Sequence, residues 1–367
     1  MNKSIGCIVL LFAALGLMAG CDRGEYGGME ERPGSVTLKI GVDVSDILSQ
    51  TRADETSEAA NDAEKMHTLR IIVVRPDGRV ERVKYIQLDN PATLQVWKFD
   101  TIVSGETKRV YLIVNENTEK TEDGIVKKVV PYDFSKIKAG TVFPLNEMYA
   151  LTFCVNSDTE RLAGPLPMSD VHRVDIAPVV PDGTEREIEC HLTVRRAAVK
   201  FTCYVTNESE KEFKAVGLEM EKMARYSYYL PRGFNDGYTV PSVDNNDYYK
   251  FRHTFAKAVV LAPKSPAEVD LLKEAGEPPI YLLEGKYVDK TEGKDETWNY
   301  KMALLLQRDE FGEKPWSTTF EYFPDLPELP RNTHVVVHAT IQRDLEIKWE
   351  VHVHPYISVP LEPDFGL

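Results

Sequence analysis

The chain has 367 residues, which suits two domains of roughly 150 residues each. Apolar residues make up 43% of the sequence and charged residues 28%, an ordinary composition for a protein that buries a core. The formal net charge is −14. This charge argues against a nucleic-acid partner, because nucleic acids are bound by basic faces.

Residues 1–20 are predicted to be a signal peptide, with Lys3 ahead of a long apolar run. The run ends in Leu17-Met18-Ala19-Gly20-Cys21, which is similar to a bacterial lipobox. The Cys21 thiol would then take a lipid, whose acyl chains hold a protein on a bilayer. The alternative is a plain secretory peptide with an accidental cysteine. No other stretch is long and apolar enough to be predicted as a membrane span.

The segment from Ser35 to Val44 alternates strictly between apolar and other residues, which predicts a strand with one buried face. The residues predicted to be buried are Val36, Leu38, Ile40, Val42 and Val44. Arg52-Ala53 follows, and then an acidic run over 54–65 that is nearly free of large apolar residues and cannot fold alone. Protease attack concentrates in such segments. Arg52 is therefore the predicted cleavage site, the alternative being an ordinary loop arginine.

The next segments predict the strands of an N-terminal domain over residues 53–187. A strand pair over 67–88 turns at Pro76-Asp77-Gly78, where proline fixes φ and glycine supplies a positive φ. A second pair over 93–117 turns at Ser104-Gly105. A short helix is predicted over 134–140, and further strands over 148–156 and 172–180.

A C-terminal domain is predicted over residues 188–367. It begins with one long strand over 189–207. A helix is predicted over 265–276, from Ser265 as cap and Pro266 at its first position to Gly276 as stop. Strands follow over 280–288, 298–307, 333–342 and 345–367. Many short strands with turn signals and few helices predict an all-β protein built from two sandwiches.

No catalytic, cofactor or metal site is predicted. The sequence contains no nucleophile elbow, phosphate loop or zinc-protease helix motif. Four histidines fall on adjacent predicted strands, but histidines facing solvent on strands are commoner than metal ligands; they are His334, His338, His352 and His354. A disulfide between Cys190 and Cys203 is left open. The tyrosine-rich segment 225–250 is interpreted as a packed loop, with a ligand or carbohydrate surface as the alternative.

Several spots along the chain together resemble the fimbrillins, the subunits of type V pili of Bacteroides-type bacteria. They are the lipobox at Cys21, the Arg52-Ala53 junction, KRVYLIVNEN at 108–117, LPMSD at 166–170, TVRRAAVKF at 193–201, RNTHVVVHATI at 331–341 and VHPYISVPLEPDFGL at 353–367. None of these motifs is a catalytic signature. Their order and spacing carry the resemblance.

The resemblance implies two tandem transthyretin-like β-sandwich domains and a structural role in a fimbrium for adhesion and biofilm formation. Such subunits are exported to the outer membrane as lipoproteins (with palmitate on the cysteine), cut by an arginine-specific protease, and lose their first strand. A neighbouring subunit then fills the groove. By this resemblance residues 21–52 are a lipidated propeptide, Cys21 carries the lipid, Arg52 is the cleavage residue and Ala53 begins the mature chain.

The resemblance also implies that the terminal segment is the donor strand, and its residues Ile357, Val359, Leu361 and Phe365 share one parity, as such a strand requires. Alternatively, this tail closes its own sandwich. Three functional hypotheses follow. The first is a polymerising pilin, in the shaft or at the tip, whose partners are other pilin subunits. The second is a fimbrial anchor that keeps its lipid, and the third is a surface glycan-binding lipoprotein.

Overall fold

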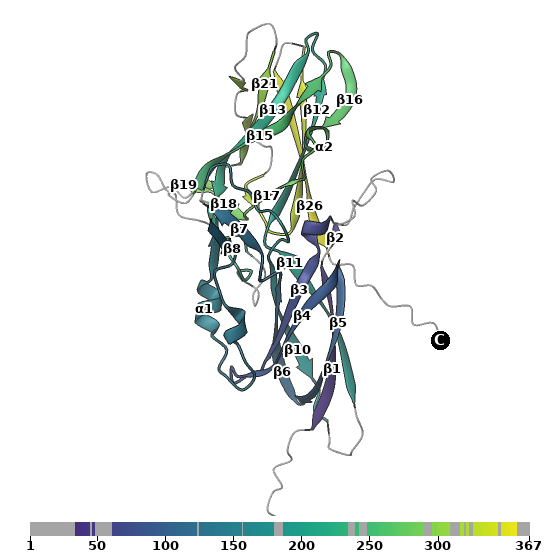
Figure 1. Ribbon diagram of the computed structural model, residues 1–367, viewed down its shortest axis with the longest axis vertical. Coiled ribbons are helices and arrows are strands. Elements are labelled where there is room, and N and C mark those ends of the chain that lie inside the picture. Colours follow the sequence, from purple (N-terminus) through teal and green to yellow (C-terminus); the bar gives the residue numbers. More distant parts are fainter. Residues whose placement is uncertain are drawn as a thin grey trace, which may run out of the picture.

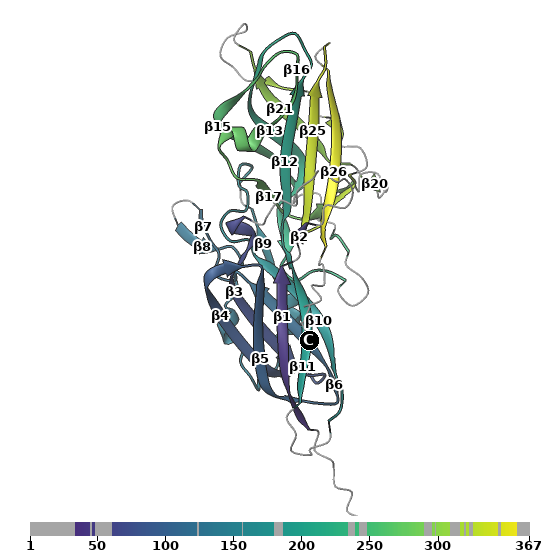
Figure 2. The same ribbon diagram turned by 90° about the vertical axis from the view of Figure 1, so that its right-hand side faces the viewer.

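The chain consists of two β-rich domains stacked along one long axis (Figures 1 and 2). The computed structural model describes residues 34–44, 46–47, 61–122, 125–155, 157–179, 186–233, 239–241, 248–289, 296–297, 299–308, 316–318, 321–322, 326–343 and 346–357. Strands dominate both domains, and the all-β class predicted from the sequence is confirmed. No helix in these ranges is long and apolar enough to cross a bilayer.

The elements of the first half of the chain are β1 (Ser35–Val44), β2 (Asp46–Ile47), η1 (Asp62–Glu64), β3 (Met66–Val74), β4 (Val80–Ala92), β5 (Leu94–Val103), β6 (Glu106–Val114), β7 (Glu119–Glu122), β8 (Ile125–Lys128), η2 (Phe134–Lys136), α1 (Leu145–Ala150), β9 (Thr152–Cys154), β10 (Met168–Ile176) and β11 (Glu187–Arg196). Those of the second half are β12 (Val199–Asn207), β13 (Phe213–Ala224), β14 (Tyr226–Tyr228), β15 (Tyr248–Leu261), β16 (Ser265–Asp270), α2 (Leu271–Ala275), β17 (Ile280–Leu282), β18 (Gly285–Lys286), β19 (Val288–Asp289), β20 (Glu296–Thr297), β21 (Lys301–Gln307), β22 (Trp316–Ser317), β23 (Glu321–Tyr322), β24 (Glu328–Leu329), β25 (Thr333–Ile341) and β26 (Ile347–Ile357).

The N-terminal domain is built on a seven-stranded ladder in the order β4-β3-β6-β10-β11-β1-β5. The first predicted strand pair is confirmed, because β3 and β4 pair and turn at Gly78. The second is correct only in its two strands and its turn at Gly105, because β5 pairs with β1 while β6 pairs with β3 and β10. Both glycines have a positive φ, which most other residues avoid. The inner faces of these strands bury a continuous core that includes all five apolar residues predicted to be buried on β1.

The C-terminal domain has two sheets that face each other. One contains β16-β12-β25-β26-β2, with β17 also paired to β12, and the other contains β15-β13-β21-β22, with β23 paired to β21. The small strand β2 is a member of the first sheet although it follows β1 in the sequence. The N-terminal segment of the chain therefore takes part in both domains.

The prediction of one long strand over 189–207 is wrong, because this segment forms two strands, β11 and β12, which lie in different domains. The break falls at Ala197-Ala198, whose small side chains are both buried where the domains meet. The buried apolar residues change parity at the break, from Leu192 and Val194 on β11 to Val199 and Phe201 on β12, so the face turned to the core changes there. Since β11 still pairs with β1 and β10, the change between sheets falls some residues after the predicted division at 187/188.

The helix predicted over 265–276 is correct only at its end. Ser265–Asp270 forms β16, which pairs with β12, and only Leu271–Ala275 is helical. Asp270 is the true cap, accepting the Lys273 N–H at 3.1 Å, and Gly276 ends the helix with a left-handed φ of 75°. The strand predicted over 148–156 is likewise shorter, because its first residues belong to α1.

A buried ion pair lies at the junction of the two domains. Arg331 and Glu284 are almost fully buried, and the Arg331 Nε donates to Glu284 Oε1 at 2.8 Å. Arg331 also donates to the Tyr229 carbonyl at 2.9 Å, and that same carbonyl accepts the hydroxyl of Ser169 on β10. These bonds link the segment before β25 to the N-terminal sheet.

Candidate functional site

The first strand, β1, lies inside the N-terminal sheet with a partner on each side. It runs parallel to β11, from Thr37 opposite Glu187 to Val44 opposite Val194, and antiparallel to β5. Figure 2 shows β1 between these two strands along the face of the domain. We call β1 the leader strand and its position between β11 and β5 the slot.

The inward face of the leader strand is part of the core. Leu38, Ile40 and Val42 have no exposed surface, and the two outer members of the set, Val36 and Val44, are 3% exposed. Burying an apolar side chain of this size contributes about 1.5–3 kcal/mol. The burial of this face, predicted from the alternation, is therefore present in the structure and contributes much of the stability of the domain.

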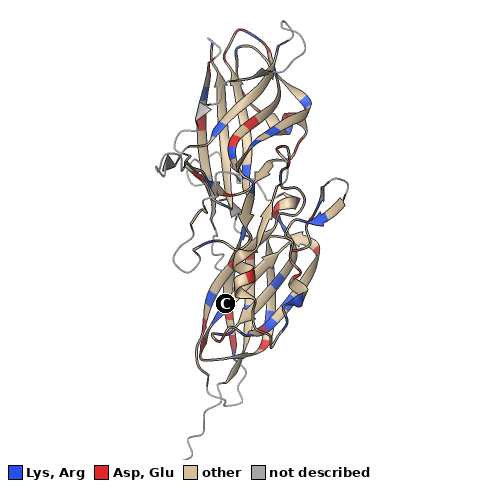
Figure 3. Cartoon of the chain, turned by 90° about the vertical axis from the view of Figure 1, so that its left-hand side faces the viewer, with Lys and Arg blue, Asp and Glu red and all other residues tan. Residues whose placement is uncertain are grey.

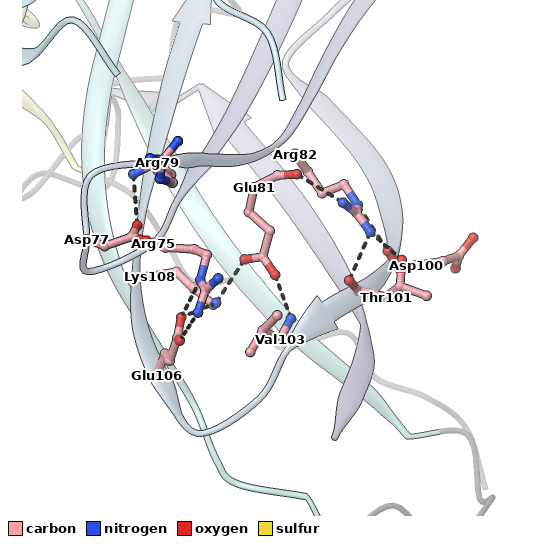
Figure 4. A network of polar contacts seen from close by, with 10 residues as sticks. All are labelled: Arg75, Asp77, Arg79, Glu81, Arg82, Asp100, Thr101, Val103, Glu106 and Lys108. Atoms are coloured by element: carbon pink, nitrogen blue, oxygen red, sulfur yellow. Dashed lines mark hydrogen bonds and ion pairs between the residues drawn. The ribbon is translucent and has the colours of Figure 1, made fainter. Parts of the chain in front are cut away.

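Within the described residues, the only ladder partner of β5 is the leader strand. Side chains of β4 also hold β5 in place (Figure 4). Arg82 donates to the carbonyls of Asp100 and Thr101 at 3.3 and 3.0 Å, and Glu81 accepts the Val103 N–H at 2.6 Å. None of these bonds involves the leader strand, so this wall of the slot keeps an attachment when β1 is absent.

A buried lysine supports the same end of the slot. Lys108 has no exposed surface and forms ion pairs with Glu81 at 2.8 Å and Glu106 at 2.7 Å (Figure 4). Glu106 also pairs with Arg75 at 2.5 Å. The hydrogen bond from Arg75, aided by Lys108, lowers the pKa of Glu106 from 4.5 to about 2. Lys108 therefore holds in place the Glu81 carboxylate that accepts the hydrogen bond from β5.

This network predicts an acid sensitivity. A carboxylate whose pKa is lowered in the folded state stabilises the fold above its unfolded value of 4.5, and this stabilisation is lost as the pH falls toward 2. We expect Glu106→Gln to reduce the loss of unfolding free energy between pH 5 and pH 2.5 by about 1–2 kcal/mol, allowing for partial solvent exposure. Urea titrations at the two pH values measure this difference. The exposed Glu119→Gln serves as control, and an equal acid effect in both variants would contradict the assignment.

The outward face of the leader strand carries a second set of contacts. The Lys39 Nζ lies 2.7 Å from Glu189 of β11, and Lys98 of β5 lies 2.7 Å from Glu187. The hydrogen bond from Lys39 lowers the pKa of Glu189. The Thr37 hydroxyl donates to Asp100 at 3.3 Å. Polar contacts therefore tie the leader strand to both neighbouring strands on the side away from the core.

Gly41 is the buried residue of this outward face. It lies opposite His191 on β11 and Val96 on β5. A Cβ placed on Gly41 would lie 2.7 Å from Nδ1 of His191, closer than real Cβ contacts. The imidazole, on a side chain that is 42% exposed, therefore has to move before a side chain fits at position 41.

The leader segment continues into the C-terminal domain. Asp46 and Ile47 of β2 pair with Ile357 and Tyr356 at the end of β26. Ile357 is thus the one predicted donor-strand residue within the described part. The other predicted donor residues, Val359, Leu361 and Phe365, lie outside the described residues, as do Cys21, Arg52 and Ala53.

The histidines on adjacent strands whose side chains are described each have a partner within the protein. His334 bonds to the Thr202 hydroxyl at 2.9 Å, His338 to Glu268 at 2.7 Å, and His352 to Glu350 at 3.0 Å. Across the described ranges, no group of three or more histidine, cysteine or acidic residues is placed to hold a metal ion. The side chain of His354 lies outside the described set.

The sequence leaves open whether Cys190 and Cys203 form a disulfide; in the structure both are free thiols. Cys190 is half-buried on β11, Cys203 is buried on β12, and they are not bridged. In the tyrosine-rich segment, the buried Tyr229 donates to the Met168 carbonyl at 3.1 Å. Tyr248 packs edge-on against Tyr287 with ring centroids 4.7 Å apart. The described tyrosines of this segment therefore take part in packing.

Charged residues of both signs are interspersed over the two domains on the side seen in Figure 3. In that view the blue and red segments alternate along the ribbon. The slot is the feature that brings together the most residues singled out from the sequence.

Comparison with known proteins places the fold. No family model matches the sequence, and no curated protein matches it. Among solved structures, a putative cell adhesion protein from Parabacteroides distasonis matches with a TM-score of 0.55 and 11% identity, covering 89% of this chain and 99% of its own. The tip fimbrial protein Mfa3 from Porphyromonas gingivalis, with a C-terminal truncation, matches with a TM-score of 0.52 and 10% identity, covering 88% and 100%.

The chain therefore has the fold of bacterial fimbrial and cell-adhesion proteins, and the resemblance to fimbrillins inferred from its motifs is confirmed at the level of the fold. At 10–11% identity, this similarity concerns the fold alone.

Proposed function

We propose that this chain is a structural, non-enzymatic subunit of a cell-surface fimbria. It is exported as a precursor that carries lipid on Cys21 and is held at the outer membrane. An arginine-specific protease then hydrolyses the bond between Arg52 and Ala53. The leader strand leaves with the propeptide, and a strand from another pilin subunit takes its place in the slot.

One observation carries this proposal: a strand that is integral to the core lies just ahead of the predicted cleavage residue. Its loss would expose the apolar floor of the slot and the unpaired backbone groups of β11 and β5. Such an edge binds an added strand through main-chain hydrogen bonds, with side-chain pockets supplying specificity. The fold of fimbrial and adhesion proteins supports the same role.

The tail after β26 is the proposed donor segment. Its root, Tyr356 and Ile357, is paired to β2 of the leader segment in the precursor. Removal of the leader segment therefore frees this root as it empties the slot. In this scheme one cleavage prepares the subunit both to receive a strand and to donate one.

Replacing the cleavage residue tests this function. We expect Arg52→Ala, produced in a host with the processing machinery and protease, to remain at the membrane as a lipoprotein that begins at Cys21 and to form no filaments. The matched control is Arg32→Ala, because Arg32 precedes Pro33, whose ring hinders most proteases. N-terminal sequencing and electron microscopy of surface extracts provide the readouts.

The wild-type chain and the Arg32→Ala control should both begin at Ala53 and form filaments. Normal filaments from Arg52→Ala would contradict the proposal. A wild-type chain that retains a blocked, lipidated Cys21 would instead support a membrane anchor or a surface glycan-binding lipoprotein.

A further inference from the structure

Apolar alternation alone leaves the register of a strand in the slot undetermined. A slip by one residue turns the apolar side chains outward, so it is excluded. A slip by two residues keeps the same face toward the core. Contacts on the outward face must therefore distinguish the observed register from a two-residue slip.

The close approach at Gly41 makes this distinction. A two-residue slip in either direction would put Lys39 or Asp43 at the place of Gly41, where the His191 ring already lies. Either side chain would have to displace that ring. Of the four outward positions of the leader strand between Val36 and Val44, only position 41 lacks a side chain, so the observed register is the one without this clash.

The charges on the slot walls add a second requirement. Lys39 is paired with Glu189, and Glu187 lies two residues earlier on β11. Beside the Glu189 carboxylate a basic residue is favoured and an acidic one repelled. On the other wall Lys98 lies opposite Lys39, but its charge is already paired with Glu187 at 2.7 Å. The slot therefore fits a strand with a basic residue two positions before a glycine, both pointing away from the core.

The tail of this same chain lacks that pattern. Residues 349–367 contain neither Lys nor Arg. If the predicted donor residues face the core, Gly366 reaches the place of Gly41 in only one register, and that register puts Asp364 beside Glu189. Every other register that covers this place with the tail puts a side chain under the His191 ring.

Prolines add to the mismatch. Pro360 and Pro363 have no N–H to donate, and the slot is bounded by a strand on each side, so proline is disfavoured at its inner positions.

We propose that the slot selects its occupant by these outward contacts and takes its strand from a different type of subunit, rather than from the tail of a second copy of this chain. The selected strand carries outward Lys or Arg beside Glu189 and outward glycine beside His191. This inference rests on the proposed function, because it specifies which partner fills the vacated slot.

The first test uses the intact full-length chain and does not depend on strand exchange. We expect Lys39→Glu and Glu189→Lys each to destabilise the N-terminal domain, and the double variant to recover most of the loss. We likewise expect Gly41→Leu to destabilise strongly and His191→Ala to relieve part of that effect. Thermal unfolding of the single and double variants measures both couplings. Purely additive effects would overturn the selection mechanism.

The second test uses the full chain cut after Arg52, with all residues present, and fluorescent peptides in excess. We expect a peptide of residues 34–47 to exchange into the slot. Its Lys39→Glu form should bind about three- to tenfold more weakly, and its Gly41→Leu form at least about tenfold more weakly. The tail peptide 352–367 should not compete. In the Glu189→Lys protein the Lys39→Glu peptide should regain affinity.

The outcomes distinguish a failure of the proposed partner selection from a failure of the proposed strand exchange. A tail peptide that competes as well as the leader peptide, or a Gly41→Leu peptide that binds equally well, overturns the inference and leaves strand exchange intact. If no peptide enters the slot, the proposed function fails, and with it the choice of partner. Selective exchange together with coupled variants supports both.

Discussion

A chain that begins at Ala53 will be less stable than the full-length precursor by at least about 5 kcal/mol, because it lacks the five buried apolar side chains of the leader strand. Domains of this kind have a total stability of about 5–15 kcal/mol. The N-terminal domain will thus be at the limit of folding when the slot is empty. Chemical denaturation of both chains gives the difference.

Refilling the slot will restore this stability. A synthetic peptide of residues 34–47 should raise the melting temperature of the shortened chain in a concentration-dependent way, as expected for a ligand that binds only the folded state. The control peptide carries Ile40→Asp, which would place a charge at a position with no exposed surface. Equal melting temperatures for the two chains, with no response to the peptide, would show that the leader strand is dispensable.

Arg331→Met will destabilise the full-length chain by about 3–5 kcal/mol, the usual effect of removing one partner from a buried ion pair. The cause is Glu284, which is 1% exposed and would be left buried without its guanidinium partner. Because Arg331 also bonds to the Tyr229 carbonyl, the contact between the domains should loosen as well. Denaturation followed by separate probes in the two domains will detect both effects.

The pair itself is tested by removing both charges. Arg331→Met combined with Glu284→Gln should be more stable than Arg331→Met alone, since no buried charge remains unpaired. The control is Arg225→Met, whose ion pair with Asp158 at 3.1 Å is exposed. A loss from Arg331→Met no larger than that of the control would refute the role given to the buried pair.

The sequence predicted the all-β class and the inward face of the leader strand because both depend on local alternation. An alternation with a period of two residues shows which side chains share one face of a strand. Five apolar residues in succession at alternate positions over 36–44 make the assignment of this face unambiguous. The turns at Gly78 and Gly105 were predictable for a similar reason, since each needs a residue that adopts a positive φ.

Long-range pairing explains the errors. Ser265-Pro266 has the local signature of a helix start, yet the ladder between β16 and β12 holds this segment extended. At Ala197-Ala198 both the strand partners and the parity of the buried apolar residues change, and the prediction of one continuous strand did not take account of that change of parity. Propensity is a weak guide where tertiary contacts decide the conformation.

Two kinds of residue that shape the slot were not predicted from the sequence. Glu81, Arg82 and Lys108 are ordinary charged residues in the sequence, and only the three-dimensional packing shows that they fix β5. Gly41 did carry a signal, because a glycine inside a strand often marks a close approach of another group. Identifying that group as His191 required the parallel register of β1 and β11.

In the proposed mechanism, proteolysis empties the slot and a neighbouring subunit refills it. The rate at which the Cys190 thiol is alkylated tests this directly. Cys190 lies across the ladder from Ile40, and burial raises its pKa to about 11. Its alkylation by iodoacetamide, followed by mass spectrometry, should be slow in the precursor, fast in the monomer without its leader strand, and slow again in filaments. The buried Cys203 should stay unreactive throughout as an internal control. A Cys190 that reacts as fast in filaments as in the leaderless monomer would contradict the account.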